Sequence, residues 1–142
     1  MSTNGKAKAE VVVITGASGG IGRAAALEFG KHGASVALLA RGDQGLAGAT
    51  HDVEAAGGRA LAIPTDVADY AQVEAAAQRV EDELGPIGIW VNVAFTNVFS
   101  EFWDVTPEEW KRLTDVTYLG YVWGTMAAMK RMRPRNPTSI SR

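Results

Sequence analysis

A glycine-rich segment that directly follows an apolar run constrains this sequence more than any other feature. The apolar run is Val11 to Ile14, and residues 15–22 read Thr-Gly-Ala-Ser-Gly-Gly-Ile-Gly before a stretch of helical period. An unbroken apolar run is typical of a parallel strand covered on both faces. Glycines let the chain turn tightly, and free amides at the start of the next helix attract negative charge. We therefore expect a strand-turn-helix unit that binds a diphosphate, rather than a merely flexible turn.

The rest of the sequence repeats this order of short strand and longer helix. Further strands are expected at Ser35–Ala40, Arg59–Ile63 and Ile87–Asn92. The alternation is typical of parallel βαβ units and predicts a single α/β domain. Each of the three helices between these strands is expected to have one apolar face. In chain order, the faces consist of Ile21, Ala24, Ala25 and Phe29 for the first helix, of Leu46, Ala49, Val53 and Ala56 for the second, and of Val73, Ala76, Ala77, Val80 and Leu84 for the third.

A last helix is expected from Pro107, with Thr106 as its N-cap, to about Met132. Residues 116–129 are apolar on nearly every side, so we expect both faces of this helix to be covered. The sheet can cover one face, and the other requires a further part of the fold or a second subunit. The basic residues at its end are interpreted as a solvated helix terminus rather than a phosphate site: Lys130, Arg131, Arg133 and Arg135.

The composition argues against several other classes of protein. The net charge is −2 and the basic residues are scattered, which gives no electrostatic footprint for nucleic acid. The absence of cysteine excludes a disulfide framework, a thiolate metal site and a cysteine nucleophile. His32 and His51 lack acidic neighbours at metal-ligand spacing, so no metal site is expected. With no signal peptide and no apolar stretch long enough for a membrane span, we expect a cytoplasmic protein.

Several motifs together resemble those of the short-chain dehydrogenase/reductase family. Its Thr-Gly-x-x-x-Gly-Ile-Gly fingerprint matches residues 15–22, its Asp-Val pair matches residues 66–67, and its Asn-Asn-Ala-Gly motif resembles residues 92–95. The resemblance implies a Rossmann-like doubly wound parallel sheet of about four strands in the order 3-2-1-4, with helices on both faces. It also implies an NAD(P) site, in which the aspartate contacts the adenine amino group. The cofactor-binding residues expected on this basis are Gly16, Ser18, Gly19, Gly20, Ile21, Gly22, Arg41, Asp66, Val67, Asn92 and Ala94.

The end of the second strand bears on the choice of cofactor. An acid there hydrogen-bonds the adenosine ribose and disfavours a 2′-phosphate, but this chain has Ala40. The next residue, Arg41, carries a guanidinium group suited to a phosphate. By the resemblance, NADP(H) is preferred over NAD(H), and the alternative is that Arg41 is an ordinary surface arginine.

The chain also departs from the family pattern, which places a Tyr-x-x-x-Lys pair on one helical face for proton transfer. The residues four positions after the tyrosines Tyr70, Tyr118 and Tyr121 are Glu74, Val122 and Thr125. Thr117 falls at the position of the family's catalytic asparagine, either altering a water relay or bonding a preceding helix carbonyl. Phe95 stands where the family has glycine, and Val93 replaces an amide side chain. We therefore expect no catalytic residue in this chain.

Three functions stay open at this point. The chain is an oxidoreductase of alcohols or carbonyls by descent, a non-catalytic NADP(H)-binding module, or an interaction fragment that forms a homo-oligomer through the last helix. The Pro, Ser and Thr residues at 137–141 are unsuited to a buried strand, so strand four is expected to be a free edge of the sheet. The expected organisation is one incomplete domain over residues 1–142, truncated before the Tyr-x-x-x-Lys motif. Residues 1–8 are expected to be flexible and residues 134–142 irregular.

Overall fold

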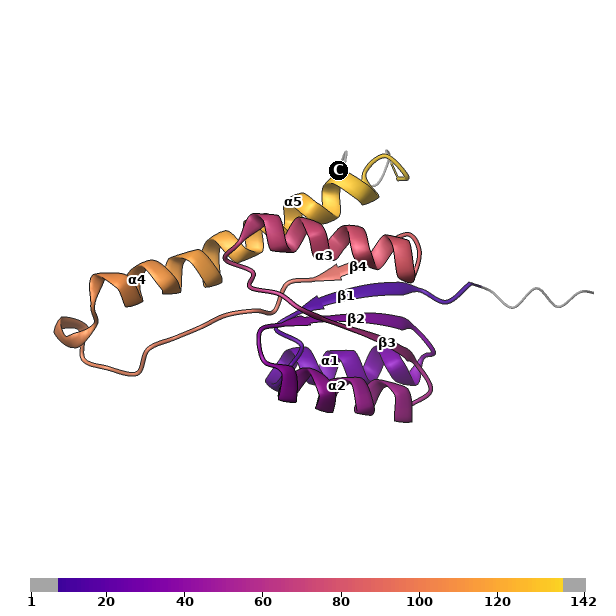
Figure 1. Cartoon of the computed structure of the whole chain (residues 1–142), viewed down its shortest axis with the longest axis horizontal. Helices are drawn as coiled ribbons and strands as arrows, with labels where there is room; N and C mark the ends of the chain where they lie inside the picture. The colour runs from indigo at the N-terminus through magenta and orange to yellow at the C-terminus, as the bar shows by residue number, and fades with distance from the viewer. Residues whose placement is uncertain (1–7, 137–142) are drawn as a thin grey trace, which may run out of the picture.

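The computed structural model describes residues 8–136, which form a four-stranded parallel sheet with helices on both faces (Figure 1). The strands are β1 (Val11–Thr15), β2 (Ser35–Ala40), β3 (Arg59–Pro64) and β4 (Ile89–Val91), in the order β3-β2-β1-β4. Helices α1 (Gly20–Lys31) and α2 (Asp43–Ala55) cover one face, while α3 (Tyr70–Glu83) and α5 (Gly120–Met132) lie on the other. The predicted fold class and strand order are confirmed.

The core consists of two apolar layers, because alternate residues of a strand point to opposite faces of a sheet. Val12 and Ile14 pack in the layer with α1 and α2, whereas Val11 and Val13 pack in the layer with α3. The residue pattern predicted this arrangement for α2 and α3. Their buried residues are Leu46, Ala49 and Val53 on α2, and Val73, Ala76, Ala77 and Val80 on α3.

The predicted buried face of α1 is confirmed only in part. Ala25 and Phe29 are half-buried and pack against the core, but Ile21 and Ala24 are exposed. The fully buried residues of this helix are Gly22, Ala26 and Gly30. The reason is close backbone packing. A Cβ atom on Gly22 would overlap the carbonyl oxygen of Gly16, and one on Gly30 would lie 3.1 Å from the Val53 carbonyl oxygen.

Strand β4 is shorter than predicted, because the segments that flank it have other hydrogen-bond partners. Before β4, the amide of Ile87 donates to the carboxylate of Glu81. After β4, the amides of Val93 and Ala94 both donate to the hydroxyl of Thr15. Within residues 8–136, β4 is an edge of the sheet, with β1 as its partner.

The last helical region is three consecutive segments rather than one α-helix. It begins with α4 (Pro107–Thr114), whose capping box between Thr106 and Glu109 confirms the predicted N-terminus. A π-helical turn, η2 (Asp115–Leu119), joins α4 to α5, and a short 3-10 turn, η1 (Phe102–Asp104), precedes them. One face of this region is exposed, at the side chains of Tyr118, Tyr121, Met126 and Met129. Residues 8–136 therefore do not supply the second cover that the apolar pattern calls for, and that part of the prediction stays a prediction.

The basic end of α5 is solvated only in part, because Lys130, Arg133 and Arg135 are exposed, as predicted, whereas Arg131 is not. The Arg131 side chain is buried and donates to the Glu74 carboxylate and to the Ala127 carbonyl. Arg135 donates to the Glu81 carboxylate and to the Ile87 carbonyl. These contacts fasten α5 onto α3.

Two of the expected terminal segments lie largely outside the described residues. Of the expected flexible segment 1–8, only Lys8 is described, and of the expected irregular segment 134–142, the structure describes the turn 134–136. Across residues 8–136, no helix combines the length and the apolar character that crossing a bilayer requires.

Candidate functional site

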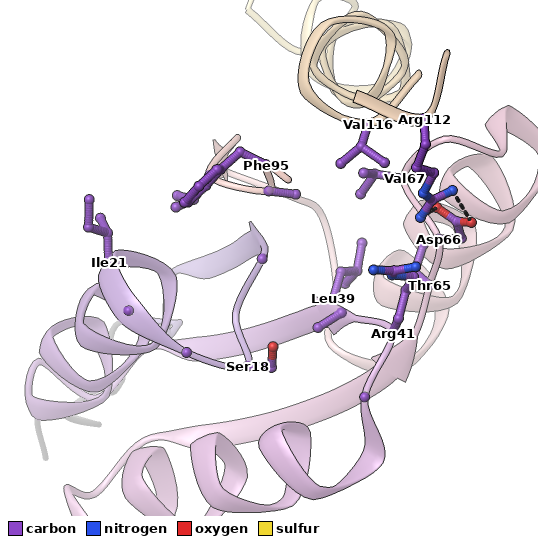
Figure 2. A pocket seen from close by; sticks show the side chains of 17 residues that line it. Ser18, Ile21, Leu39, Arg41, Thr65, Asp66, Val67, Phe95, Arg112 and Val116 are labelled. Carbon is purple, nitrogen blue, oxygen red and sulfur yellow. Dashed lines mark hydrogen bonds and ion pairs between the residues drawn. The ribbon is translucent and has the colours of Figure 1, made fainter. Parts of the chain in front are cut away.

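A pocket of about 430 Å³ opens at the carboxyl ends of the strands. Its walls are the β1–α1 turn, residues 39–42 at the end of β2, residues 65–67 after β3, residues 93–95 after β4, and two side chains from α4 and η2. Figure 2 shows Ile21 and Phe95 on one side of the pocket, and Arg41, Asp66 and Arg112 on the other. Ligands of open α/β sheets bind at this end of the strands, where the strand order reverses, so the pocket is the candidate site.

The β1–α1 turn requires glycine at two positions. Gly16 and Gly20 have positive φ angles of 67° and 52°, which side chains rarely adopt. A Cβ atom on Gly16 would also lie 2.8 Å from the backbone of Ala94, whereas the space around Gly19 and Gly20 is open. A ligand can therefore approach the backbone closely at residues 19 and 20, while residue 16 packs against the neighbouring strand end.

The start of α1 leaves its amide groups available to a ligand. Gly19 is the N-cap and provides no side-chain cap, and the first turn holds no acidic residue. The first amides of an α-helix have no partner within the helix, and the helix dipole makes that end attractive to anions. The amides of this turn and the open space over them can accept a phosphate group.

Thr15 joins the two halves of the site. Its buried hydroxyl accepts hydrogen bonds from the amides of Val93 and Ala94, at 3.0 and 3.2 Å. These bonds hold the segment after β4 against the glycine turn. Sequence reasoning treated Thr15 only as the first letter of the glycine motif, because its partners are nearly 80 residues away along the chain.

Asp66 is held at the far end of the pocket by Arg112. The two terminal nitrogens of this guanidinium group donate to the two carboxylate oxygens, at 2.8 and 3.0 Å (Figure 2). The hydrogen bond from Arg112 lowers the pKa of Asp66 below its ordinary value, against the effect of burial. Arg112 was missed by sequence reasoning. Val116 stands four residues later, and so on the same helical face, and it also lines the pocket.

Arg41 lies on the rim of the pocket, beside Asp66 and Thr65 (Figure 2). Within residues 8–136, its side chain makes no hydrogen bond or close ion pair. Ala40, the last residue of β2, is buried and offers no carboxylate at this point. The rim of the pocket therefore carries a guanidinium group that no hydrogen bond to the described residues holds, and its positive charge helps to lower the pKa of Asp66.

The sequence of this chain matches the model of one protein family over most of its length. The model of the short chain dehydrogenase family matches residues 10–140. The chain belongs to this family.

Individual relatives agree with that assignment. Over 129 residues the chain is 40% identical to a 3-dehydrosphinganine reductase of Danio rerio, a match that covers 87% of this chain and 39% of that protein. Over 125 residues it is 37% identical to an uncharacterized oxidoreductase of Bacillus subtilis, covering 88% of this chain and 35% of that protein. A crystal structure of a short-chain type dehydrogenase/reductase from Mycobacterium marinum superimposes with a TM-score of 0.84 and 33% identity, covering 89% of this chain and 51% of that one. This short-chain dehydrogenase chain thus spans less than half the length of the two curated relatives.

The structure brings most of the predicted short-chain dehydrogenase site residues together. Nine of the eleven line the pocket, and the exceptions are Gly22 and Asn92. Gly22 packs behind the turn, against Gly16. The Asn92 side chain accepts a hydrogen bond from the indole of Trp90 and donates to the hydroxyl of Thr125. It lines a second, more apolar cavity of about 240 Å³ between β4 and α5.

Thr117, at the family's asparagine position, does not line the pocket and does not bond a preceding carbonyl of its own helix. Its hydroxyl donates to the carbonyl of Thr96 and accepts from the amide of the same residue, both at 3.2 Å. This reciprocal pair ties the segment after β4 to the π-helical turn. A single sequence carries no signal for such a contact, because it depends on how a loop of irregular structure folds back.

Proposed function

We propose that this chain is the NADP(H)-binding portion of a short-chain dehydrogenase/reductase that transfers hydride between NADP(H) and an alcohol or carbonyl substrate. The observation that carries the proposal is the uncapped start of α1 at the glycine turn, in a pocket whose opposite end holds a fixed carboxylate. The two ends suit the diphosphate and the adenine of one dinucleotide. Members of this family generally bind NAD(P)(H).

The residues present suit the cofactor in both shape and charge. The open space over Gly19 and Gly20 allows a diphosphate to reach the first amides of α1, as glycine-rich turns of dinucleotide sites require. Asp66 would accept a hydrogen bond from the adenine amino group. Leu39, Val67 and Val116 supply apolar walls to the pocket on which a purine can rest. Gly22 and Asn92 would support the site from outside the pocket.

The preference for NADP(H) rests on Arg41 and Ala40. A guanidinium group that makes no hydrogen bond within residues 8–136 is suited to bind the 2′-phosphate, and no carboxylate at the end of β2 competes for the ribose. We expect isothermal titration calorimetry to give a lower Kd for NADPH than for NADH, by about tenfold or more, since a charge-assisted pair contributes about 1.5–3 kcal/mol.

The test of this preference is Arg41→Asp, which we expect to abolish or reverse it. Arg59→Asp is the matched control, because Arg59 is exposed at the start of β3, at the opposite end of the strand from the pocket, and the charge change is the same. Equal Kd values for NADPH and NADH in the unchanged protein would contradict the proposal.

For the chain as printed, we propose cofactor binding without turnover. Bound NADPH supplies a hydride, but the carbonyl oxygen that receives it also needs a proton donor. None of the three tyrosines has a lysine four residues later, and the one donor of the Thr117 hydroxyl is engaged by the Thr96 carbonyl. The test is NADPH oxidation by the purified chain with a panel of ketones. Carbonyl-dependent oxidation above background would contradict this proposal.

A second candidate function is self-association, favoured by the exposed apolar face of the last helix. The side chains of Tyr118, Tyr121, Met126 and Met129 are all exposed there. Such a face is typical of an interaction surface. Light scattering after gel filtration tests the candidate, with Met126→Glu and Met129→Glu combined to disrupt the oligomer. A monomer in the unchanged protein at high concentration would contradict it.

A further inference from the structure

The ion pair between Arg112 and Asp66 joins two distant parts of the chain at the rim of the pocket. Arg112 comes from α4 and Asp66 from the segment after β3, 46 residues earlier. Both side chains are about one-third exposed, and both line the pocket. An exposed salt bridge contributes little to stability as a rule, so its position in the site matters more than its strength.

The bonding of the Asp66 carboxylate leaves one defined place for a further donor. Oδ1 accepts from the amide of Ala68 and from Arg112, each at 3.0 Å, whereas Oδ2 accepts, among the described residues, only from Arg112, at 2.8 Å. A carboxylate has about four lone-pair sites, two on each oxygen. Three are occupied, and the free one is on Oδ2. The backbone is also fixed, because the amide of Asp66 donates to the side chain of Gln72.

Arg112 determines this asymmetry. The amide of Ala68 alone can hold one oxygen but leaves the carboxylate free to rotate about its last bond. Two parallel bonds from a planar guanidinium group fix both oxygens, which a lysine cannot do. With Arg112 in place, the free acceptor on Oδ2 keeps one position, because two of the five N–H donors of the guanidinium group point at the Asp66 carboxylate.

We propose that Arg112 is a positioning residue that makes the pocket selective for purines carrying an amino group at carbon 6. This inference rests on the proposed function, because it assigns the base end of the same nucleotide site. A 6-amino group donates to the free acceptor on Oδ2. A 6-oxo group presents an oxygen to a carboxylate oxygen, so hypoxanthine and guanine nucleotides are rejected.

The experiment compares NADPH with reduced nicotinamide hypoxanthine dinucleotide phosphate, which differs only in having oxygen at carbon 6 of the base. Calorimetry on the unchanged chain is expected to give a Kd for the hypoxanthine compound about tenfold higher or more, given the usual strength of hydrogen bonds to charged groups. In Arg112→Met the ratio of the two Kd values is expected to fall to about threefold or less. Arg112→Lys, which keeps the charge but not the paired donors, is expected to lie between them.

Arg79→Met is the control, since Arg79 also pairs with a carboxylate, Glu83, but on the exposed surface of α3. It should leave the ratio unchanged. If Arg112→Met does not fold, as judged by circular dichroism, Arg112→Gln replaces it, and the same fall in the ratio is expected.

The outcomes separate this inference from the proposed function. A purely structural role for Arg112 would raise both Kd values and leave their ratio unchanged, and that result overturns the inference alone. Equal binding of the two compounds by the unchanged chain also overturns it. If the unchanged chain binds neither compound, the proposed function fails and the inference fails with it.

Discussion

The starts of α1 and α3 are built in opposite ways, although both helices follow parallel strands of the same sheet. The Asp69 side chain caps α3 by accepting from the amides of Ala71 and Gln72. Helix α1 begins at Gly19, with no side-chain cap and no acidic residue in its first turn. Helix α4 resembles α3, with Thr106 in a capping box.

The difference indicates what each helix start is for. A cap satisfies the first amides from within the protein and adds about 1 kcal/mol to stability. A helix whose first amides have no cap lacks that stabilisation, but these amides can bind an anion. Among the starts of α1 to α4, α1 alone has neither cap nor first-turn acid, and it borders the pocket. The first three predictions below change one of these two helix starts, and the fourth concerns ion pairs elsewhere on the α3 side of the molecule.

The largest effect is expected for Gly22→Ala, which disrupts the geometry of the open start. The new Cβ would overlap the carbonyl oxygen of Gly16, so the turn must shift. We expect NADPH affinity to fall about 100-fold or more and stability by about 1–3 kcal/mol, measured by calorimetry and urea unfolding. Gly48→Ala is the control, because the nearest atoms to its Cβ would belong to the end of the Arg23 side chain rather than to the backbone. Unchanged affinity in Gly22→Ala would contradict the proposed role of the turn.

Gly19→Asp is expected to cap the first amides of α1 without distorting the turn. Gly19 has an extended backbone with φ −165°, and the space for a Cβ atom is open. The new carboxylate would accept from the α1 amides and repel the diphosphate. We expect NADPH to bind about tenfold more weakly or worse, with no fall in the Tm of the free protein. Gly19→Ser, an uncharged cap, should show a smaller loss, and equal losses in both variants would argue against the charge effect.

Asp69→Ala opens the closed start of α3. We expect unfolding in urea to show a loss of about 1 kcal/mol, because two amides lose their acceptor. The Kd for NADPH should change less than twofold, since Asp69 does not line the pocket. Asp69→Ser keeps a capping oxygen and serves as the control. A large loss of affinity in Asp69→Ala alone would show that the two helix starts are not independent.

The smallest effect concerns the carboxylates on the α3 side of the molecule. Arg131 lowers the pKa of Glu74 below its ordinary value of 4.5, and Arg112 lowers that of Asp66 below 3.8. A carboxylate with a lowered pKa stabilises the fold above its unfolded pKa and loses that contribution as pH falls through the folded pKa. We expect the Tm to decline below about pH 4.5. Glu74→Gln should cost about 1 kcal/mol or less at pH 7 and nothing at pH 2, and a cost that persists at pH 2 would point to lost packing instead.

Sequence patterns predicted the elements whose burial follows from one regular period. The bounds of β2 agree with the prediction because an apolar run stands between Gly33 and Arg41. The face of α1 was assigned incorrectly in part, because an apolar pattern assigns no burial to glycine, although Gly22 and Gly30 are buried in close backbone contacts. The π-helical turn was not predicted, since the apolar residues run through it without a break.

The site residues that stand in short sequence motifs were predictable, but the contacts between residues far apart in the sequence were not. The glycine turn, Arg41 and Asp66 stand in short motifs, and the structure places them around one pocket. The pairing of Asp66 with Arg112 and that of Thr117 with Thr96 join segments 46 and 21 residues apart. No period or motif in one sequence specifies such pairs, because they depend on where α4 docks after an irregular loop.

The most direct test of the open helix start is an amide-resolved NMR titration of the ¹⁵N-labelled chain with NADPH. We predict saturable shifts concentrated at the amides of Gly19, Gly20 and Ile21, with the capped amides of Ala71 and Gln72 nearly unmoved. A folded protein whose α1 amides stay in place at saturating NADPH, or whose shifts are largest at the start of α3, would contradict the account.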